Sequence, residues 1–185
     1  CKAPLFALLR YSNAGRNEGL AIARAGEADD EAPAGPRHED DVCKAVAATV
    51  LNDASKIKWT PLNASQRFAV LQSGEIDMLS RNTTWTLTRD ASLGLNFTGV
   101  TYYDGQGFMV PKKSKVTSAK QLKGATVCVQ SGTTTEKNLS DYSKAAGLNM
   151  KPVVFDTQEA TNKAYFSGRC QAYTTDASGL ASIRN

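Results

Sequence analysis

Two short polar clusters carry the side chains with the clearest capacity for binding chemistry. The first supplies amide, hydroxyl and guanidinium groups from Asn82, Thr83, Thr84 and Arg89. Arginine suits a carboxylate because its two parallel N–H groups match the two carboxylate oxygens. We therefore expect Arg89 to bind a carboxylate.

The second cluster combines an anion-attracting turn with one acidic side chain. Residues 131–134, Ser-Gly-Thr-Thr, join a predicted strand to the start of a predicted helix, where free backbone N–H groups and the helix dipole attract anions. Asp176 offers an acceptor for an ammonium group, so the two clusters together would bind a zwitterion. Taken singly, each residue also fits a simpler account: Arg89 on the surface, Asp176 as a helix N-cap and the threonines as a turn.

Alternating helices and strands position these clusters. After Asp41, the valines Val42, Val46 and Val50 recur at four-residue spacing, which predicts a helix. A capping box predicts a further helix at Asn63 (with Gln66), and a capping serine predicts one at Ser118. Helices are also expected over 133–146 and 157–167, and glycines predict helix ends at Gly74, Gly124 and Gly147. Strands are expected over 56–60, 76–80, 125–130, 150–155 and 170–174. This alternation favours an α/β fold with parallel sheets covered by helices.

One pattern occurs twice. Residues 71–80 and 165–174 share the end of a helix, then Ser-Gly, then a strand that leads into polar residues. Ligands bind beyond the carboxyl ends of strands in open α/β sheets, so two such units would present their polar ends to a shared cleft. We expect two lobes rather than one extended sheet, although Ser-Gly helix ends are common enough for a chance match.

Composition excludes several classes of protein. The 185 residues carry 22 Lys and Arg against 18 Asp and Glu, and a net charge of +4 is too small to indicate nucleic-acid binding. No apolar run approaches the roughly 20 residues of a membrane-spanning helix. A basic patch of five lysines, interpreted as solvated, comprises Lys112, Lys113, Lys115, Lys120 and Lys123.

The first 40 residues differ from the remainder. Residues 1–42 have a net charge of −3, and residues 23–41 contain no large apolar side chain. Such a stretch cannot offset the entropy lost on ordering, so we expect it to be disordered or loosely attached. Residues 1–40 are accordingly expected to form an irregular segment.

The cysteine pattern fits an oxidising compartment better than a zinc site. The four cysteines, Cys1, Cys43, Cys128 and Cys170, include no Cys-x-x-Cys pair, and His38 is the one histidine. We therefore expect neither a metal nor another cofactor. A pair between Cys1 and Cys43, or a lipid on Cys1, stays open.

Motifs for catalysis are missing from the sequence. A serine or threonine nucleophile needs a nearby base, and His38 lies in the low-hydrophobicity segment. The chain contains no Gly-x-Ser-x-Gly, no phosphate-binding Gly-Lys-Thr and no His-Glu-x-x-His. We expect a binding protein rather than an enzyme.

Four longer stretches resemble the periplasmic general L-amino-acid-binding proteins of ABC importers (solute-binding protein family 3): residues 76–89, 102–110, 127–136 and 168–176. The resemblance covers about residues 41–185. It implies the type II periplasmic-binding-protein-like fold, with two α/β lobes joined by crossover strands that close on a free L-amino acid. It also implies an exported, periplasmic monomer that works with the membrane permease of an ABC importer.

The same resemblance assigns roles to individual residues. Thr84 and Arg89, with the backbone near Arg81 and Asn82, match the carboxylate site. Thr133 and Thr134 match the contacts of the second lobe, and Asp176 matches the residue that receives the α-amino group. The resemblance also pairs Cys128 with Cys170 in a disulfide. Residues 41–104 would form part of the first lobe and residues 105–185 the second, with residues 105–111 as the first crossover.

The chain departs from the family pattern at both ends. The family's opening strand and its aromatic loop have no counterpart before Asp41, and the family continues past residue 185. We expect an incomplete copy, truncated within the second lobe, with residues 1 to about 40 read out of frame. Two alternatives stay open: a dehydratase-like enzyme of the same fold that uses Asp176 as acid or base, and a fragment without function.

Overall fold

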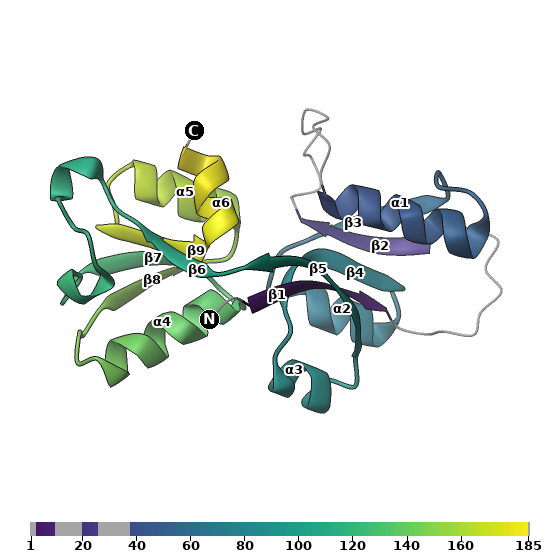
Figure 1. The fold of residues 1–185 in the computed structure, drawn as a ribbon, viewed down its shortest axis with the longest axis horizontal. Helices are drawn as coiled ribbons and strands as arrows, with labels where there is room; N and C mark the ends of the chain where they lie inside the picture. Colours follow the sequence, from purple (N-terminus) through teal and green to yellow (C-terminus); the bar gives the residue numbers. More distant parts are fainter. Residues whose placement is uncertain (1–2, 10–19, 26–37, 185) are drawn as a thin grey trace. The chain divides into compact units, whose positions relative to one another are not determined.

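The computed structural model describes residues 3–9, 20–25 and 38–184. The chain divides into two compact units, Ala3–Tyr103 and Asp104–Asn185. In each unit, helices cover both faces of one central sheet (Figure 1).

The first unit contains a five-stranded sheet in the order β3-β2-β4-β1-β5. Its strands are β1 (Ala3–Leu9), β2 (Leu20–Ala25), β3 (Ile57–Leu62), β4 (Met78–Thr84) and β5 (Asn96–Asp104). Its helices are α1 (His38–Leu51), α2 (Arg67–Ser73) and α3 (Leu87–Ser92). Side chains of a strand alternate between the two faces of a sheet. Met78 of β4 accordingly packs beneath α1 with Ile22 and Cys43, and its neighbour Leu79 packs beneath α2 with Leu71.

The second unit contains a four-stranded sheet in the order β6-β9-β7-β8. Its strands are β6 (Gln106–Met109), β7 (Thr126–Gln130), β8 (Lys151–Phe155) and β9 (Ala172–Asp176). Its helices are α4 (Thr134–Ala145), α5 (Gln158–Phe166) and α6 (Ala177–Arg184), with 3₁₀ turns η1 (Lys112–Ser114) and η2 (Ala119–Gln121). Val127 and Val129 of β7 pack with Leu139 of α4, whereas Cys128 packs with Tyr165 of α5. Figure 1 shows α4 on one face of this sheet and α5 and α6 on the other.

Both sheets are parallel at the centre, as the alternation of helices and strands predicts, but each adds an antiparallel strand. β2 runs parallel to β3 and β4, and β7 runs parallel to β8 and β9. β1 pairs with β4, and β6 with β9, in the antiparallel direction. The segment expected as a crossover, residues 105–111, contains β6. The division between units falls between Tyr103 and Asp104.

The expectation of an irregular N-terminal segment is wrong at residues 3–9 and 20–25, which form β1 and β2. β2 lies between β3 and β4, and its Ile22 is fully buried, so ladder hydrogen bonds and one apolar side chain order this stretch. Residues 38–41, also expected to be disordered, lie within α1. The remaining positions of the segment, residues 1–2, 10–19 and 26–37, lie outside the described residues, and the origin of this segment stays a prediction.

The two copies of the Ser-Gly pattern have the same local structure. Gly74 ends α2 with φ of 78°, and Gly168 follows α5 with φ of 81°, a left-handed conformation that glycine adopts readily. β4 and β9 then follow. Both strands begin two residues later and end later than the sequence indicates, because Arg81–Thr84 and Thr175–Asp176 continue the ladders rather than leaving them.

The disulfide that the resemblance implied is confirmed. Cys128 in β7 is bonded to Cys170, which lies just before β9, and their Cα atoms are 5.6 Å apart. Cys43 is fully buried in the other unit, beside Ile22 and Met78. Cys1 lies outside the described residues, so its pairing stays a prediction.

Removing the disulfide is expected to destabilise the unit that contains it. The bond joins residues 42 positions apart, for which the loss of chain entropy in the unfolded state corresponds to about 4 kcal/mol. Both tryptophans, Trp59 and Trp85, lie in the other unit. In a Cys128→Ser/Cys170→Ser variant, hydrogen exchange of the β7 amides should accelerate at lower urea, while the midpoint from tryptophan fluorescence should not move.

Cys43→Ala is the matched control, since it removes a buried sulfur from the unit that holds both tryptophans. It should lower the fluorescence midpoint and leave exchange of the β7 amides unchanged. These predictions assume that the two units unfold separately. Equal shifts of the fluorescence midpoint and of β7 amide exchange in either variant would contradict that assumption.

Candidate functional site

The end of β4 carries the first cluster of predicted site residues. Arg81 is buried, and its Nη1 donates to the carbonyl oxygen of Leu62 on β3 at 2.7 Å. Its Nε donates to Oδ1 of Asn82 at 3.4 Å. The side chain of Arg81 therefore ties β4 to β3 and orients Asn82, and its backbone continues the strand.

Arg89 is held beside this strand end by three contacts. Its backbone N–H donates to Oγ1 of Thr86, the N-cap of α3, at 3.2 Å. Its Nη1 donates to the carbonyl oxygen of Thr84 at 2.9 Å. Its Cζ lies over the ring of Phe68, 4.8 Å from the centroid. Arg89 is half-buried and anchored, unlike the loosely held surface arginine of the simpler account.

A third arginine at this strand end, Arg67, did not emerge from the sequence. It is 1% exposed. Its Nη1 donates to Oγ1 of Thr83 at 3.1 Å and to the carbonyl oxygen of Asn82 at 3.3 Å, and its Cζ lies 5.0 Å from the centroid of Phe68. The sequence places Arg67 beside Phe68 at the start of a predicted helix, a position at which a charged side chain is usually expected to face solvent.

The turn before α4 is closed by the chain's own groups. Gly132, with φ of 69°, donates its N–H to Oε2 of Glu136 at 2.9 Å. The N–H of Glu136 donates to Oγ1 of Thr133 at 3.1 Å, and that hydroxyl donates to the carbonyl oxygen of Gln130 at 2.7 Å. The expectation of free N–H groups is thus wrong at Gly132, because the carboxylate of Glu136 accepts the N–H that was expected to bind an external anion. Thr134 is the first residue of α4.

Asp176 is the last residue of β9, directly before α6. The first amides of α6 bond elsewhere: Ala177 donates to the carbonyl oxygen of Gly105 at 2.6 Å, and the N–H and hydroxyl of Ser178 donate to the carboxylate of Asp104. Asp104 at the end of β5 therefore caps this helix, a role that the simpler account gave to Asp176.

The carboxylate of Asp176 contributes to a raised pKa of the buried Tyr173. Tyr173 on the same strand is fully buried, and burial, followed by the negative charge of Asp176, raises the pKa of its hydroxyl from 10.0 to about 12. Among the described residues, no group forms a hydrogen bond with that hydroxyl. Asp176 therefore lies close enough to Tyr173 for its carboxylate charge to disfavour the tyrosinate form.

Gln106, also missed from the sequence, links the parts of the second cluster. It pairs with Asp176 across the β6–β9 ladder. Its Nε2 donates to the carbonyl oxygen of Thr135 at 3.0 Å and to Oγ1 of Thr174 at 2.9 Å. One amide thus connects the start of α4 to the end of β9.

The predicted site residues fall into two groups. Arg81, Asn82, Thr84 and Arg89 meet at the end of β4 in the first unit, and Thr133, Thr134 and Asp176 lie near the linking amide in the second. Arg89 belongs to the first unit and Asp176 to the second, and a cleft shared by the two units stays a prediction.

The described part of the chain contains no cluster of three or more metal-ligating side chains. None of the helices in this part is both long and apolar enough to cross a bilayer.

Comparison with known proteins shows extensive similarity. The profile of the bacterial extracellular solute-binding proteins, family 3, matches residues 27–172. The general L-amino acid-binding periplasmic protein AapJ of Rhizobium johnstonii is 62% identical over 144 residues, 78% of this chain and 42% of that protein. The glutamate/glutamine/aspartate/asparagine-binding protein BztA of Rhodobacter capsulatus is 57% identical over 144 residues, 77% of this chain and 42% of that protein.

A solved structure is similar over most of the described chain. The ABC transporter periplasmic binding protein of Brucella ovis, solved with glutathione bound, has a TM-score of 0.82 and 48% identity, covering 90% of this chain and 54% of that chain. This likeness confirms the predicted type II periplasmic-binding-protein-like fold. The chain spans less than half the length of the two curated relatives.

Replacing Asp176 should lower the pKa of Tyr173. Asp176→Asn removes the smaller of two causes, so the pKa should fall from about 12 but stay above 10.0, because burial remains. The measurement is tyrosinate absorbance against pH, with Tyr173→Phe identifying the relevant step. An unchanged pKa in Asp176→Asn would contradict the electrostatic contact.

The raised pKa has a consequence for stability. Because the folded state holds this proton more tightly than the unfolded state, the contribution of Tyr173 is complete below about pH 10 and is lost as the pH rises toward 12. Tyr173→Phe should therefore lose less stability over that range than the parent chain.

Proposed function

Because this chain belongs to the bacterial extracellular solute-binding proteins of family 3, we propose that it binds L-amino acids as the extracytoplasmic component of an ABC importer. The observation that carries the proposal is the anchored guanidinium of Arg89 beside the end of β4. A planar fork held in one orientation is suited to the two oxygens of a carboxylate. The identity with AapJ, named as a general L-amino acid-binding protein, supports the ligand class.

The ligand contacts divide between the two charged ends of an amino acid. Arg89 and Thr84, with the backbone at Arg81 and Asn82, bind the α-carboxylate. Asp176, the last residue of β9, receives the α-amino group. Thr133 and Thr134 complete the contacts from the second unit.

The two units, Ala3–Tyr103 and Asp104–Asn185, correspond to parts of the two lobes. The sequence assigned residues 41–104 to the first lobe and residues 105–185 to the second. Binding shifts the lobes toward a closed form by the difference in affinity between the open and closed states. The partner is the permease of the importer, which recognises the closed form in the periplasm, and the binding protein acts as a monomer without a cofactor.

The alternative function is a dehydratase-like enzyme that uses Asp176 as acid or base, and the two proposals differ in whether the bound ligand is converted to a product. A carrier releases its ligand unchanged. Steady conversion of a prephenate-like acid or an amino acid, abolished by Asp176→Asn, would favour the enzyme instead.

Arg89→Ala should weaken the binding of L-amino acids strongly, and calorimetry can measure the loss. Loss of one charged hydrogen-bonding partner of a carboxylate costs about 2–5 kcal/mol, or roughly 30-fold and more in affinity. The corresponding amino-acid amides, which lack the carboxylate charge, should bind weakly to both forms of the protein.

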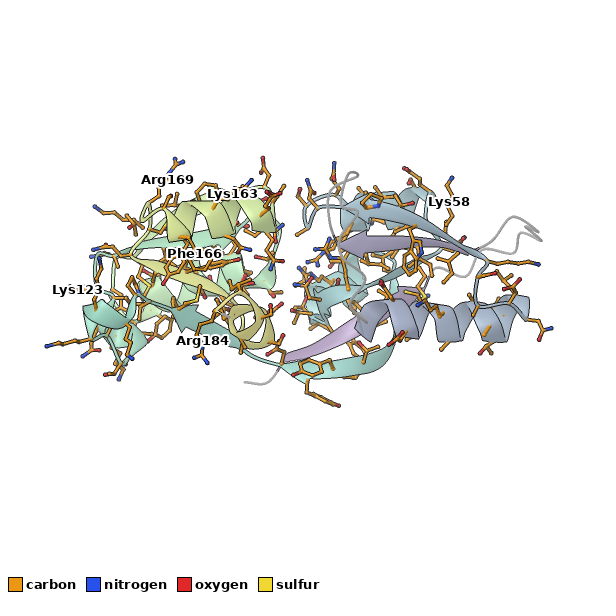
Figure 2. The ribbon with its side chains drawn as sticks, turned by 90° about the horizontal axis from the view of Figure 1, so that it is seen from above. Lys58, Lys123, Lys163, Phe166, Arg169 and Arg184 are labelled. Carbon is orange, nitrogen blue, oxygen red and sulfur yellow. A yellow bond between two sulfur atoms is a disulfide. The ribbon has the colours of Figure 1, made fainter. Side chains whose placement is uncertain are left out.

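Arg169→Ala is the matched control. Arg169 also lies over an aromatic ring, that of Phe155 at 5.3 Å, but it points outward from the second unit (Figure 2). Its removal should leave affinity unchanged. Equal affinity of Arg89→Ala and the parent chain would remove the carboxylate assignment.

Glutathione is a second candidate ligand, because the similar Brucella ovis protein was solved with it bound. Its γ-glutamyl end carries the same ammonium and carboxylate groups as a free amino acid. We expect L-glutamate to displace glutathione competitively in calorimetry, and Arg89→Ala to weaken both. Simultaneous binding of the two compounds would point to separate sites.

A further inference from the structure

Phe68 is the meeting point of two guanidinium groups. The Cζ atoms of Arg67 and Arg89 lie 5.0 Å and 4.8 Å from the centroid of its ring. A guanidinium within about 6 Å of an aromatic centroid is attracted by the negative face of the ring. The two arginines come from different helices, α2 and α3, so the ring connects elements that are separate in the sequence.

The ring is itself fixed in the first unit. Phe68 packs against the buried cluster formed by Leu71, Ile76, Leu79 and Leu95. The turn that leads into its helix is held by a reciprocal pair of hydrogen bonds: the N–H of Gln66 donates to Oδ1 of Asn63 at 3.1 Å, and the N–H of Asn63 donates to Oε1 of Gln66 at 3.3 Å. The position of the ring is therefore set by the core and by the bonded turn before α2.

Adjacent residues of α2 hold the two halves of the proposed carboxylate site. Arg67 bonds to Thr83 and to the carbonyl oxygen of Asn82, which fixes the strand end. Phe68 lies against Arg89, which in turn bonds to the carbonyl oxygen of Thr84. The strand end and the guanidinium are thus positioned by neighbouring side chains of one helix.

We propose that Phe68 is a positioning residue for Arg89, its ring setting the plane of the guanidinium that receives the ligand carboxylate. This inference rests on the proposed function. A guanidinium carries five N–H donors in a fixed fork, so the orientation of its plane decides which pair of oxygens it can meet. The carbonyl oxygen of Thr84 fixes one end of the fork, and the ring fixes its face.

Three variants separate this role from simple packing. Phe68→Leu keeps an apolar side chain but removes the aromatic face, and should weaken amino-acid binding by about tenfold. Phe68→Tyr keeps the face and should stay within about twofold of the parent chain. Leu95→Val disturbs the same buried cluster and should leave affinity unchanged.

A fourth comparison isolates the orientation of the fork. In an Arg89→Lys background, Phe68→Leu should cost less than about threefold, because an ammonium group has no plane to orient. A tenfold loss in both backgrounds, or an equal loss in Leu95→Val, would show that Phe68 acts through packing and would overturn the inference.

A ligand-free measurement keeps this inference distinct from the proposed function. The ring current of Phe68 should shift the Nε–H proton signal of Arg89 upfield in the NMR spectrum of the parent chain, and the shift should vanish in Phe68→Leu but persist in Leu95→Val. If the shift is present and no amino acid binds, the proposed function fails and the contact that positions Arg89 stands. If the shift is absent, the inference is overturned whether or not the chain binds amino acids.

Discussion

The first unit depends on the pairing of β4 with two neighbours. β4 runs parallel to β2 on one side and antiparallel to β1 on the other. Its first residues, Met78 and Leu79, pack into the hydrophobic clusters on the two faces of the sheet. Its last residues, Arg81–Thr84, carry the polar groups of the proposed carboxylate site. One strand thus builds the hydrophobic interior and carries the residues of the proposed carboxylate site, and any slip of its register would move both together.

The helices and their caps could be predicted well because the signals are local. Ser118 accepts the backbone N–H expected of a cap, and Thr133 and Thr157, where the predicted helices begin, do the same. The pair Asn63 and Gln66 forms the expected reciprocal bonds, but in the turn before α2, which begins at Arg67. The valine spacing correctly predicts α1, but Val50 is 65% exposed, while Cys43 and Ala47 are fully buried. Four-residue spacing identifies a helix, yet the buried face is set by the sheet beneath it.

Long-range contacts explain what the sequence did not reveal. β2, Leu-Ala-Ile-Ala-Arg-Ala, is poor in large apolar residues, and it is ordered by strands from much later in the chain. Arg67 is buried because Thr83 and the carbonyl oxygen of Asn82 accept its hydrogen bonds, which local sequence cannot indicate. The carboxylate of Glu136 in α4 accepts the N–H of Gly132, so a turn that the sequence predicts as an anion site is already bonded to a side chain of the helix that follows it. The roles of Arg89 and Asp176 in ligand binding stay predictions. The contact of Arg89 with Phe68 joins two helices, which the sequence pattern of either helix alone does not indicate.

The placement of Cys43 has a consequence for the pairing of cysteines as the chain folds in an oxidising compartment. Cys43 is enclosed by Ile22 and Met78, and both precede Cys128. The first unit can thus enclose this sulfur before the later pair is made, leaving Cys128 to await Cys170 with one fewer competitor. A substitution that slows the burial of Cys43 would therefore leave its thiol available to react with Cys128 or Cys170. Its first effect would be a wrong disulfide at a cysteine of the second unit, although the substitution lies in the first.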